Sequence, residues 1–265
     1  MSGGPVPISP MELAAASALI LVHGAVSTWL RLGLGRQILV ASSRSLIQLS
    51  LLGMLLVPVF RIAHPALVLG MAIVMVLAAA VEAVRRARRS YRGVGLHALG
   101  SLGVSGLATG VLGTAGILGV QPWYEPRYLI PLLGMILGNA LTGVSLGLDR
   151  CLEGLDAGRD RVEEDLAFGA TRWEASRPVV AGALRAALVP ILNTMSVVGL
   201  VSIPGMMTGQ ILGGTPPEQA ARYQIVILFM VAGATAMAST GAVLLAARSL
   251  FDDAHRLRAD RVTVR

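Results

Sequence analysis

Long apolar segments separated by short polar ones dominate the chain. We delimit seven apolar segments, at 11–30, 38–60, 66–84, 98–120, 128–148, 183–204 and 223–247. Each is close to the roughly 20 residues that a helix needs to cross about 30 Å of hydrocarbon. Only helices and closed barrels satisfy their backbone groups in lipid, and these segments are too long and too continuously apolar for barrel strands. The pattern therefore predicts an all-α, polytopic integral membrane protein with about seven transmembrane helices.

The first segment is only moderately hydrophobic, because it holds His23 among several small residues. Six spans are therefore the alternative to seven. Residues 1–30 contain neither Arg nor Lys, so the segment lacks the positive amino-terminal region of a secretory signal peptide. We expect it to be a retained span.

Composition indicates a membrane domain rather than a soluble one. Charged residues make up 14% of the chain, against about 25% in soluble globular domains. Hydrophobic residues make up 54%, and the mean hydropathy is +0.70. No long repeat, low-complexity tract or flexible linker is evident, so we interpret residues 1–265 as one transmembrane domain.

The basic residues set the expected topology. The 22 Lys and Arg residues are all Arg, and most lie in alternate loops and in the C-terminal tail. The other loops hold only Arg61, Arg127 and Arg222. Because cytoplasmic loops are enriched in positive charge, we expect a cell inner-membrane protein with its N-terminus outside and its C-terminus in the cytoplasm. This topology accounts for the net charge of +7, and we do not expect nucleic-acid binding.

Small residues recur every three or four positions in the fourth and fifth segments. Lipid provides no hydrophobic force between helices, so close backbone approach must hold them together, and small residues permit it. This spacing favours helix packing, within the chain or at a dimer seam, over a glycine-lined substrate path. The two stripes are Gly106, Gly110, Gly113, Gly116 and Gly119, and then Gly134, Gly138, Thr142, Ser145 and Gly147.

A charged segment at 150–182 stands apart from the apolar ones. Acidic residues crowd its part from Asp160 to Asp165, where they favour a helix N-terminus. Gly169 can reverse the chain without a Cβ penalty. We expect a short second helix after it, with Pro178 starting or kinking the next span. The segment is predicted to be a cytoplasmic helix–turn–helix.

An apolar stripe would give this loop a docking surface. Leu166, Ala170 and Trp173 fall at i, i+4 and i+7, which is the spacing of one helix face. Trp and Arg are favoured anchors at protein interfaces, and Arg172 precedes Trp173. From periodicity alone, an amphipathic helix lying on lipid headgroups is an equal alternative.

The loop resembles the "EAA" loop by which bacterial ABC-importer permeases contact their ATPases. Glu163 lies six residues before Gly169, and Ala170, Thr171, Arg172 and Trp173 follow. Importers have two small residues where this chain has Glu164 and Asp165. The resemblance therefore implies the coupling role and not the direction of transport. The expected ATPase-coupling residues are Glu163, Gly169, Ala170, Arg172 and Trp173.

Motifs across the second half of the chain resemble the FetB family of ABC permeases, which includes bacterial iron-export permeases and plant aluminium-tolerance half-transporters. The resemblance implies a permease, expected to work as a homodimer, that pairs with a separate ATPase subunit and, for bacterial members, exports iron. The matching runs are Ile130–Ala140, Phe168–Thr171, Leu184–Pro190, Val198–Gly209 and Tyr223–Ile225.

The chain has no phosphate-binding loop of its own. The motif Gly-x-x-x-x-Gly-Lys-Ser/Thr needs a lysine, and the sequence contains none. We therefore expect no cofactor in this chain, with ATP and Mg²⁺ bound by the partner ATPase. The alternatives are a secondary transporter driven by an ion gradient, an ABC permease for a non-metal substrate such as a nucleotide sugar, and a membrane scaffold that transports nothing.

Polar residues inside spans are candidates for the substrate pathway, because they are costly in lipid. We select Gln48, Asn139 and Asn193 on this ground, although for the two asparagines hydrogen bonds between helices are the favoured explanation and lining of a pathway is the alternative. No cluster of ionisable groups indicates an enzyme, and the sequence does not identify a metal site.

A Pro-Gly-Met-Met run ends the sixth segment. Pro204 and Gly205 are expected to break or kink the helix, as broken helices do where backbone lines a transporter cavity. Met206 and Met207 could offer thioethers, but these are soft ligands that suit Cu(I) better than iron. We interpret the run as an outer gate rather than a metal cage.

Overall fold

A computed structural model describes residues 8–252 and 254–264. These residues form mainly helices, together with one pair of two-residue strands. The helices are α1 (Pro10–Trp29), α2 (Gly35–Ile62), α3 (Pro65–Arg86), α4 (Val94–Val111) continued by the π-helical turn η1 (Leu112–Ile117), α5 (Pro126–Ala157), α6 (Arg159–Ala167), α7 (Arg172–Val197), α8 (Gly205–Leu212), α9 (Pro217–Ser249) and the 3₁₀ turn η2 (Ala259–Arg261). The strands are β1 (Arg89–Ser90) and β2 (Thr263–Val264).

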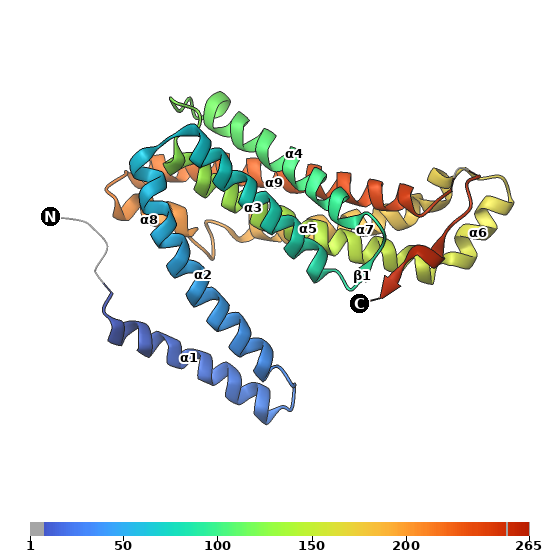
Figure 1. Ribbon diagram of the computed structural model, residues 1–265, viewed down its shortest axis with the longest axis horizontal. Coiled ribbons are helices and arrows are strands. Elements are labelled where there is room, and N and C mark those ends of the chain that lie inside the picture. The colour runs from blue at the N-terminus through green and yellow to red at the C-terminus, as the bar shows by residue number, and fades with distance from the viewer. Residues whose placement is uncertain (1–7, 253, 265) are drawn as a thin grey trace.

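Five long helices, α3, α4, α5, α7 and α9, form an elongated bundle (Figure 1). Helix α5 is central and packs against the other four. Its buried face carries Leu133, Ile136, Leu148 and Leu152, none of which is measurably exposed. The short helix α6 lies at one end of the bundle together with the C-terminal segment, and α8 lies at the opposite end. We call these the α6 end and the α8 end.

Helices α1 and α2 form a hairpin that projects from this bundle (Figure 1). Helix α1 packs on α2, and α2 has few contacts with α5. Arg44 of α2 forms an ion pair with Glu82 of α3, with 3.3 Å between Nη2 and Oε2. Most apolar side chains of the hairpin are exposed, as lipid-facing residues are.

The seven predicted spans correspond to seven helices that are long and apolar enough to cross a membrane within the described residues. The first segment forms helix α1, which is one of these seven. The largest differences from the prediction lie in the sixth segment, which was expected at 183–204. Helix α7 starts at Arg172 and ends at Val197, so the span extends into the charged loop and stops before Pro204.

Pro178 does not interrupt α7, contrary to the expectation that it starts or kinks a span. It lies inside the helix and leaves the Glu174 carbonyl without its usual N–H donor. Both residues are exposed, so water can satisfy that carbonyl. Capping fixes the helix start earlier, because Thr171 Oγ1 accepts from Glu174 N–H and the Glu174 carboxylate accepts from Thr171 N–H at 2.8 Å.

Small residues of α4 and α5 bring the helices close together, as their spacing predicted. A Cβ built on Gly106 or Gly110 would lie 2.8 Å from Leu137 or Leu133 of α5. In α5, Gly143 is one of the glycines at which an added Cβ would lie closest to atoms of α7 and α9. Gly143 was not part of the predicted stripe. Gly138 has nothing within 4 Å of such a Cβ, so it takes no part in packing within the chain.

We expect Gly143→Ala to destabilise the bundle by about 1–3 kcal/mol, as overpacking of a filled core does. The added Cβ would lie 2.5 Å from Ser239 Oγ and 3.2 Å from the carbonyl oxygen of Ala187, and the helix backbone cannot move aside cheaply. Thermal unfolding in detergent measures the effect. Gly138→Ala, in the same helix with an open surrounding, is the control and should leave the melting temperature within error; equal melting temperatures for both variants would contradict this account.

Candidate functional site

The predicted coupling loop is shorter than 150–182 and contains one separate helix. Helix α5 continues to Ala157, α6 follows at Arg159, and the chain reverses between Phe168 and Thr171. Gly169 has a φ of +92°, which favours glycine and confirms its expected turn. The short second helix expected after Gly169 does not exist on its own, because those residues are the first turns of α7.

The apolar stripe expected from Leu166, Ala170 and Trp173 is divided by this turn. Leu166 and Ala170 are half-buried and pack against the core of the bundle. Trp173 lies beyond the turn on α7, and 51% of its surface is exposed. The prediction of a single stripe was wrong because helical spacing does not continue across the chain reversal at Gly169.

An exposed phenylalanine at the turn was missed in the sequence. Phe168 is 84% exposed and precedes Gly169, whose own surroundings are open. Its signal was present, since Phe168 is the one aromatic residue of the charged segment before Trp173. Together, Phe168 and Trp173 present two exposed apolar side chains on the two sides of the turn. We call residues 168–173 the knob.

Two of the expected coupling residues are engaged inside the chain. Glu163 Oε1 accepts from Arg159 Nε at 2.6 Å along α6, and this hydrogen bond and charge raise the pKa of Arg159. The backbone N–H of Arg172 donates to His255 Nδ1 at 3.3 Å. Glu163 is therefore paired within α6, and the backbone of Arg172 connects the knob to the C-terminal segment.

The C-terminal segment, residues 250–252 and 254–264, folds back over the α6 end, and we call it the strap. Leu257 is buried in the main core cluster. The N–H of Arg258 donates to the Leu250 carbonyl at 2.7 Å. Beyond it, β2 pairs antiparallel with β1, which lies between α3 and α4. The strap thus joins the α3–α4 connection to the α6 loop, whereas the sequence suggested only a basic tail.

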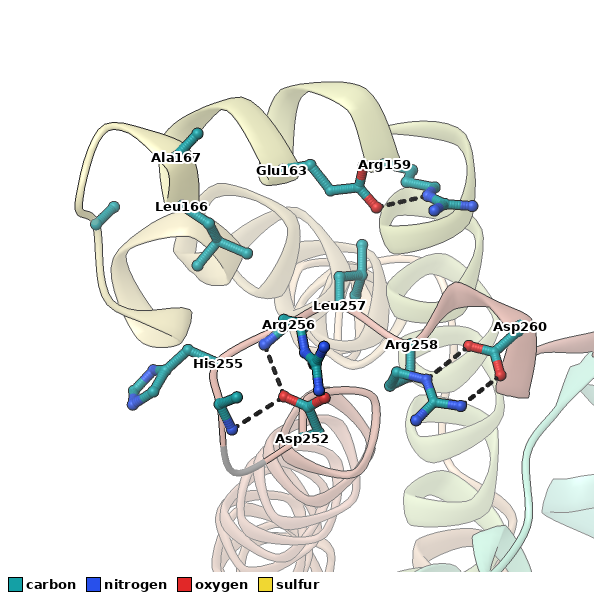
Figure 2. A pocket seen from close by; sticks show the side chains of 12 residues that line it. Arg159, Glu163, Leu166, Ala167, Asp252, His255, Arg256, Leu257, Arg258 and Asp260 are labelled. Atoms are coloured by element: carbon teal, nitrogen blue, oxygen red, sulfur yellow. Dashed lines mark hydrogen bonds and ion pairs between the residues drawn. The ribbon is translucent and has the colours of Figure 1, made fainter.

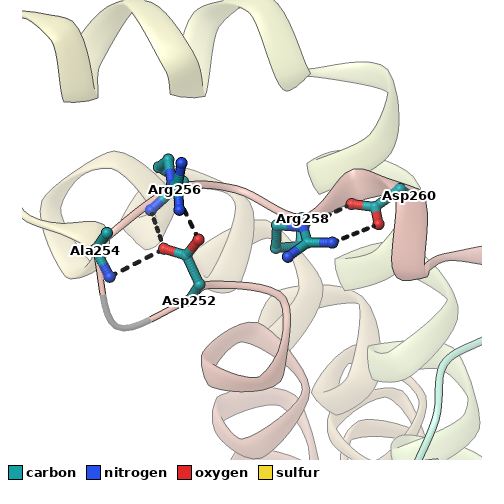
Figure 3. A network of polar contacts seen from close by, with 5 residues as sticks. All are labelled: Asp252, Ala254, Arg256, Arg258 and Asp260. Atoms are coloured by element: carbon teal, nitrogen blue, oxygen red, sulfur yellow. Dashed lines mark hydrogen bonds and ion pairs between the residues drawn. The ribbon is translucent and has the colours of Figure 1, made fainter.

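Asp252 shapes the turn that starts the strap (Figure 3). Its Oδ1 accepts from the backbone N–H groups of Ala254 and Arg256 at 3.0 and 2.9 Å, and its Oδ2 accepts from Arg256 Nε at 3.0 Å. The backbone hydrogen bond from Arg256, followed by the Arg256 charge and opposed by desolvation, holds the pKa of Asp252 below its usual value. The turn is therefore intact at neutral pH and would weaken only as the pH falls through that lowered pKa.

A cavity of about 640 Å³ lies between α6 and the strap (Figure 2). Leu166 and Leu257 contribute apolar surface to it. Its rim carries three ion pairs, each made within the rim, namely Arg159–Glu163, Asp252–Arg256 and Arg258–Asp260. Because these charges already neutralise one another, the cavity does not select an ion by net charge.

The expected pathway residues do not converge on one cavity. Gln48 of α2 is exposed on the projecting hairpin. Asn139 Nδ2 donates to the Met135 carbonyl of its own helix at 2.9 Å, so it makes no hydrogen bond between helices. Asn193 is exposed on α7. The structure therefore places these three side chains on separate helix surfaces.

The break after α7 differs in place from the expectation. Val198 leaves the helical conformation, and it pairs with Ser202 in an isolated bridge. Pro204 then precedes the first turn of α8, which begins at Gly205. These two residues start a helix instead of breaking one, because proline suits a helix start and not its interior.

A second cavity, of about 450 Å³, lies behind this break at the α8 end. Met207 and Gln224 line it, and Gln224 Oε1 is buried without a hydrogen-bond partner among the described residues. Met206 instead packs in a cluster with residues of α9. Within residues 8–252 and 254–264, no group of three His, Cys, Asp or Glu side chains could hold a metal ion.

We expect Asp252→Ala to release the strap, because the turn loses both backbone contacts and the ion pair. Limited trypsin digestion should then cleave faster after Arg256 and Arg258, and mass spectrometry of the fragments measures it. Asp252→Asn is the matched control, since its amide oxygen can still accept from the two N–H groups. It loses only an exposed ion pair, worth about 0–1 kcal/mol, so its digestion should stay near that of the unaltered chain. Equal acceleration in both variants would refute the role given to the turn.

Comparison with known proteins places this fold in a family. Residues 10–251 match an uncharacterised protein family, UPF0014. A UPF0014 membrane protein of Synechocystis sp. is 40% identical over 210 residues, 78% of this chain and 80% of its own. No solved structure gives a significant match.

Two further relatives carry informative names. Protein ALUMINUM SENSITIVE 3 of Arabidopsis thaliana is 34% identical and covers 92% of this chain and 88% of its own. The probable iron export permease protein FetB of Escherichia coli is 30% identical and covers 94% and 95%. Both alignments extend well beyond the motifs that first suggested the resemblance. The chain is a multi-pass membrane protein and belongs to the UPF0014 family.

Proposed function

We propose that this chain is the transmembrane permease subunit of an ABC transporter, driven by a separate cytosolic ATPase. The observation that carries the proposal is the knob. Phe168 and Trp173 project at the α6 end of the bundle, which carries most of the arginines and is therefore the expected cytoplasmic end. Exposed aromatic side chains on a rigid base are typical anchors of a protein interface.

The base of the knob suits the transfer of force. Leu166 of α6 and Ala170 of the turn pack against the core of the bundle, and the Arg172 N–H donates to His255 of the strap. Helix α7 then runs without interruption from Arg172 to Val197, which at about 1.5 Å per residue is close to 40 Å. A push on the knob would therefore move the start of α7 and reach the break before α8.

In the mechanism that we propose, α7 acts as a lever between the knob and the break after Val197. Closure of two ATPases on ATP and Mg²⁺, which they would bind themselves, would displace the knob and tilt α7. The break at Val198 and the cavity lined by Met207 and Gln224 lie at the far end of the same helix. We place the outer gate there, in keeping with the role expected of the Pro204–Met207 run.

Exposed polar side chains on α7 favour a homodimer. Asn193 and Arg185 are both exposed within the apolar stretch of this helix. Facing lipid would be costly for either group, whereas a second copy of the chain, or a water-filled path between two copies, would accommodate them. The exposed Gly138 of α5 permits a close approach by such a copy.

Export of iron or a related metal is the substrate assignment that we propose, and it rests on the name of the FetB relative. The substrate would be a metal in transit, since the described residues hold no cluster suited to a resident ion. A non-metal substrate such as a nucleotide sugar is the competing assignment. An ion-gradient transporter would need an acidic group at mid-membrane, and neither the sequence nor the described residues offer one.

Phe168→Ala is expected to abolish co-purification with the ATPase while leaving the chain in the membrane. Loss of a central aromatic anchor costs about 2 kcal/mol or more, which weakens binding at least thirtyfold. Tagged pull-down from detergent extracts, with ATPase bands quantified against the permease, measures the effect. Trp173→Ala and Gly169→Asp should act in the same direction.

Phe229→Ala is the matched control, because Phe229 is 62% exposed but lies on the apolar surface of α9. It should retain the ATPase. Stoichiometric binding and full transport in the Phe168, Trp173 and Gly169 variants would contradict the proposed coupling site.

Substrate identity is tested with the reconstituted permease and ATPase in vesicles. We expect ferrous iron or another transition metal to stimulate ATP hydrolysis several-fold over the basal rate, because substrate binding favours the state in which the ATPases close. A panel of metal ions and organic candidates, including nucleotide sugars, is compared at equal concentration. Stimulation by an organic compound and not by any metal would reject metal export but keep the ABC assignment, whereas transport without any ATPase would reject both.

A further inference from the structure

An apolar pocket of about 320 Å³ lies between the start of α7 and the end of α9. Leu244 and Ala247 of α9 and Phe251 of the strap supply one side, and Trp173 of α7 supplies the other. Arg172 and Arg248 complete the lining, one at the start of α7 and the other near the end of α9. The pocket is thus almost wholly apolar, with positive charge contributed from both helices.

Neither guanidinium group is neutralised by the part of the chain that the structure describes. No carboxylate of residues 8–252 or 254–264 lies within ion-pair distance of Arg172 or Arg248. The arginines of the neighbouring rim, Arg159, Arg256 and Arg258, are by contrast all paired. Two unpaired cations beside one apolar slot provide charge complementarity for an anionic amphiphile.

The level of the pocket in the membrane indicates which kind of anionic amphiphile it suits. Arg248 ends the apolar stretch of α9, so it lies where hydrocarbon gives way to headgroups. Trp173, half exposed, belongs to the residue type that prefers the same level. Leu244 lies one turn deeper along α9, toward the hydrocarbon. A ligand there would have its negative group at the arginines and its apolar part beside Leu244.

We propose that this pocket binds an anionic phospholipid of the leaflet at the α6 end, with its phosphate between Arg172 and Arg248 and the upper part of one acyl chain along Leu244. Basic pockets between transmembrane helices on the cytoplasmic side hold anionic headgroups by the same chemistry. The lipid would bridge α7 and α9 next to the knob and fix the side chain of Trp173. This site rests on membrane insertion and does not depend on the ATPase assignment.

The test uses the full chain purified in detergent and titrated with phosphatidylglycerol, followed by native mass spectrometry of the first bound lipid. Phosphatidylcholine with the same acyl chains is titrated in parallel. We expect a clear preference for phosphatidylglycerol. Arg248→Ala should weaken its binding about fivefold, the effect of removing one arginine near an anionic headgroup, and Arg248→Lys should restore most of it.

A second variant tests the apolar half of the site. Leu244→Trp fills the slot at a position that is already 37% exposed, so folding should tolerate it, and binding of phosphatidylglycerol should fall while both arginines remain. Arg85→Ala is the matched control, because Arg85 is an exposed arginine in the last turn of α3 and does not line the pocket. Its affinity for phosphatidylglycerol should be unchanged.

Three results would overturn the proposal. Equal weakening by Arg85→Ala and Arg248→Ala would indicate a general belt of charge and no defined site. Equal affinity for both lipids would remove the role of the arginines. Loss of the ATPase from Arg248→Ala, with phosphatidylglycerol binding unchanged, would assign the pocket to that protein. Failure of the Phe168 pull-down leaves these outcomes unaffected, so the two proposals are tested separately.

Discussion

The close approach of α5 to α7 and α9 is the constraint on which the rest of this structure depends. In lipid, helices gain nothing from hiding apolar surface, so contact area and small residues must hold them together. Gly143 and Gly147 place the α5 backbone against Ala187 of α7 and against Ser239 and Val243 of α9. With these three helices fixed, α3 and α4 complete the bundle, and α1 and α2 remain a hairpin with few contacts to it.

This rigid centre explains why the α6 end can act as a mechanical unit. Helices α5 and α7 are both anchored in the bundle and both extend past its apolar part, so the loop that connects them starts and ends on fixed supports. The strap adds a third support by pairing β2 with β1 and by burying Leu257 in the main core cluster. In the proposed coupling mechanism, a displacement applied to the knob would therefore move α7 as a body and would not be absorbed by a flexible loop.

The fold class and the seven candidate spans could be predicted because they follow from the length of each apolar segment, which can be read directly from the sequence. The turn at Gly169 could also be predicted, since the need for a positive φ is local to that residue. The apolar stripe through Leu166, Ala170 and Trp173 could not, because whether helical spacing continues across a turn depends on where α7 is capped, at Thr171. The strap was missed for a related reason: two-residue strands have no period, and the pairing of Arg89 with Val264 joins positions that local patterns do not connect.

The prediction of the pathway residues was also limited by what a local sequence pattern can indicate. Intramembrane polarity marks Gln48, Asn139 and Asn193, but polarity alone does not say which way a side chain faces. Asn139 is satisfied within its own helix, so its presence needs no pathway. Asn193 faces outward from α7, and a lone chain in lipid would leave it unsatisfied at a cost of several kcal/mol per group. In the homodimer proposed above, a second copy arranged around α7 would satisfy this group and would also place α7, the break after Val197 and the proposed gate beside the same interface.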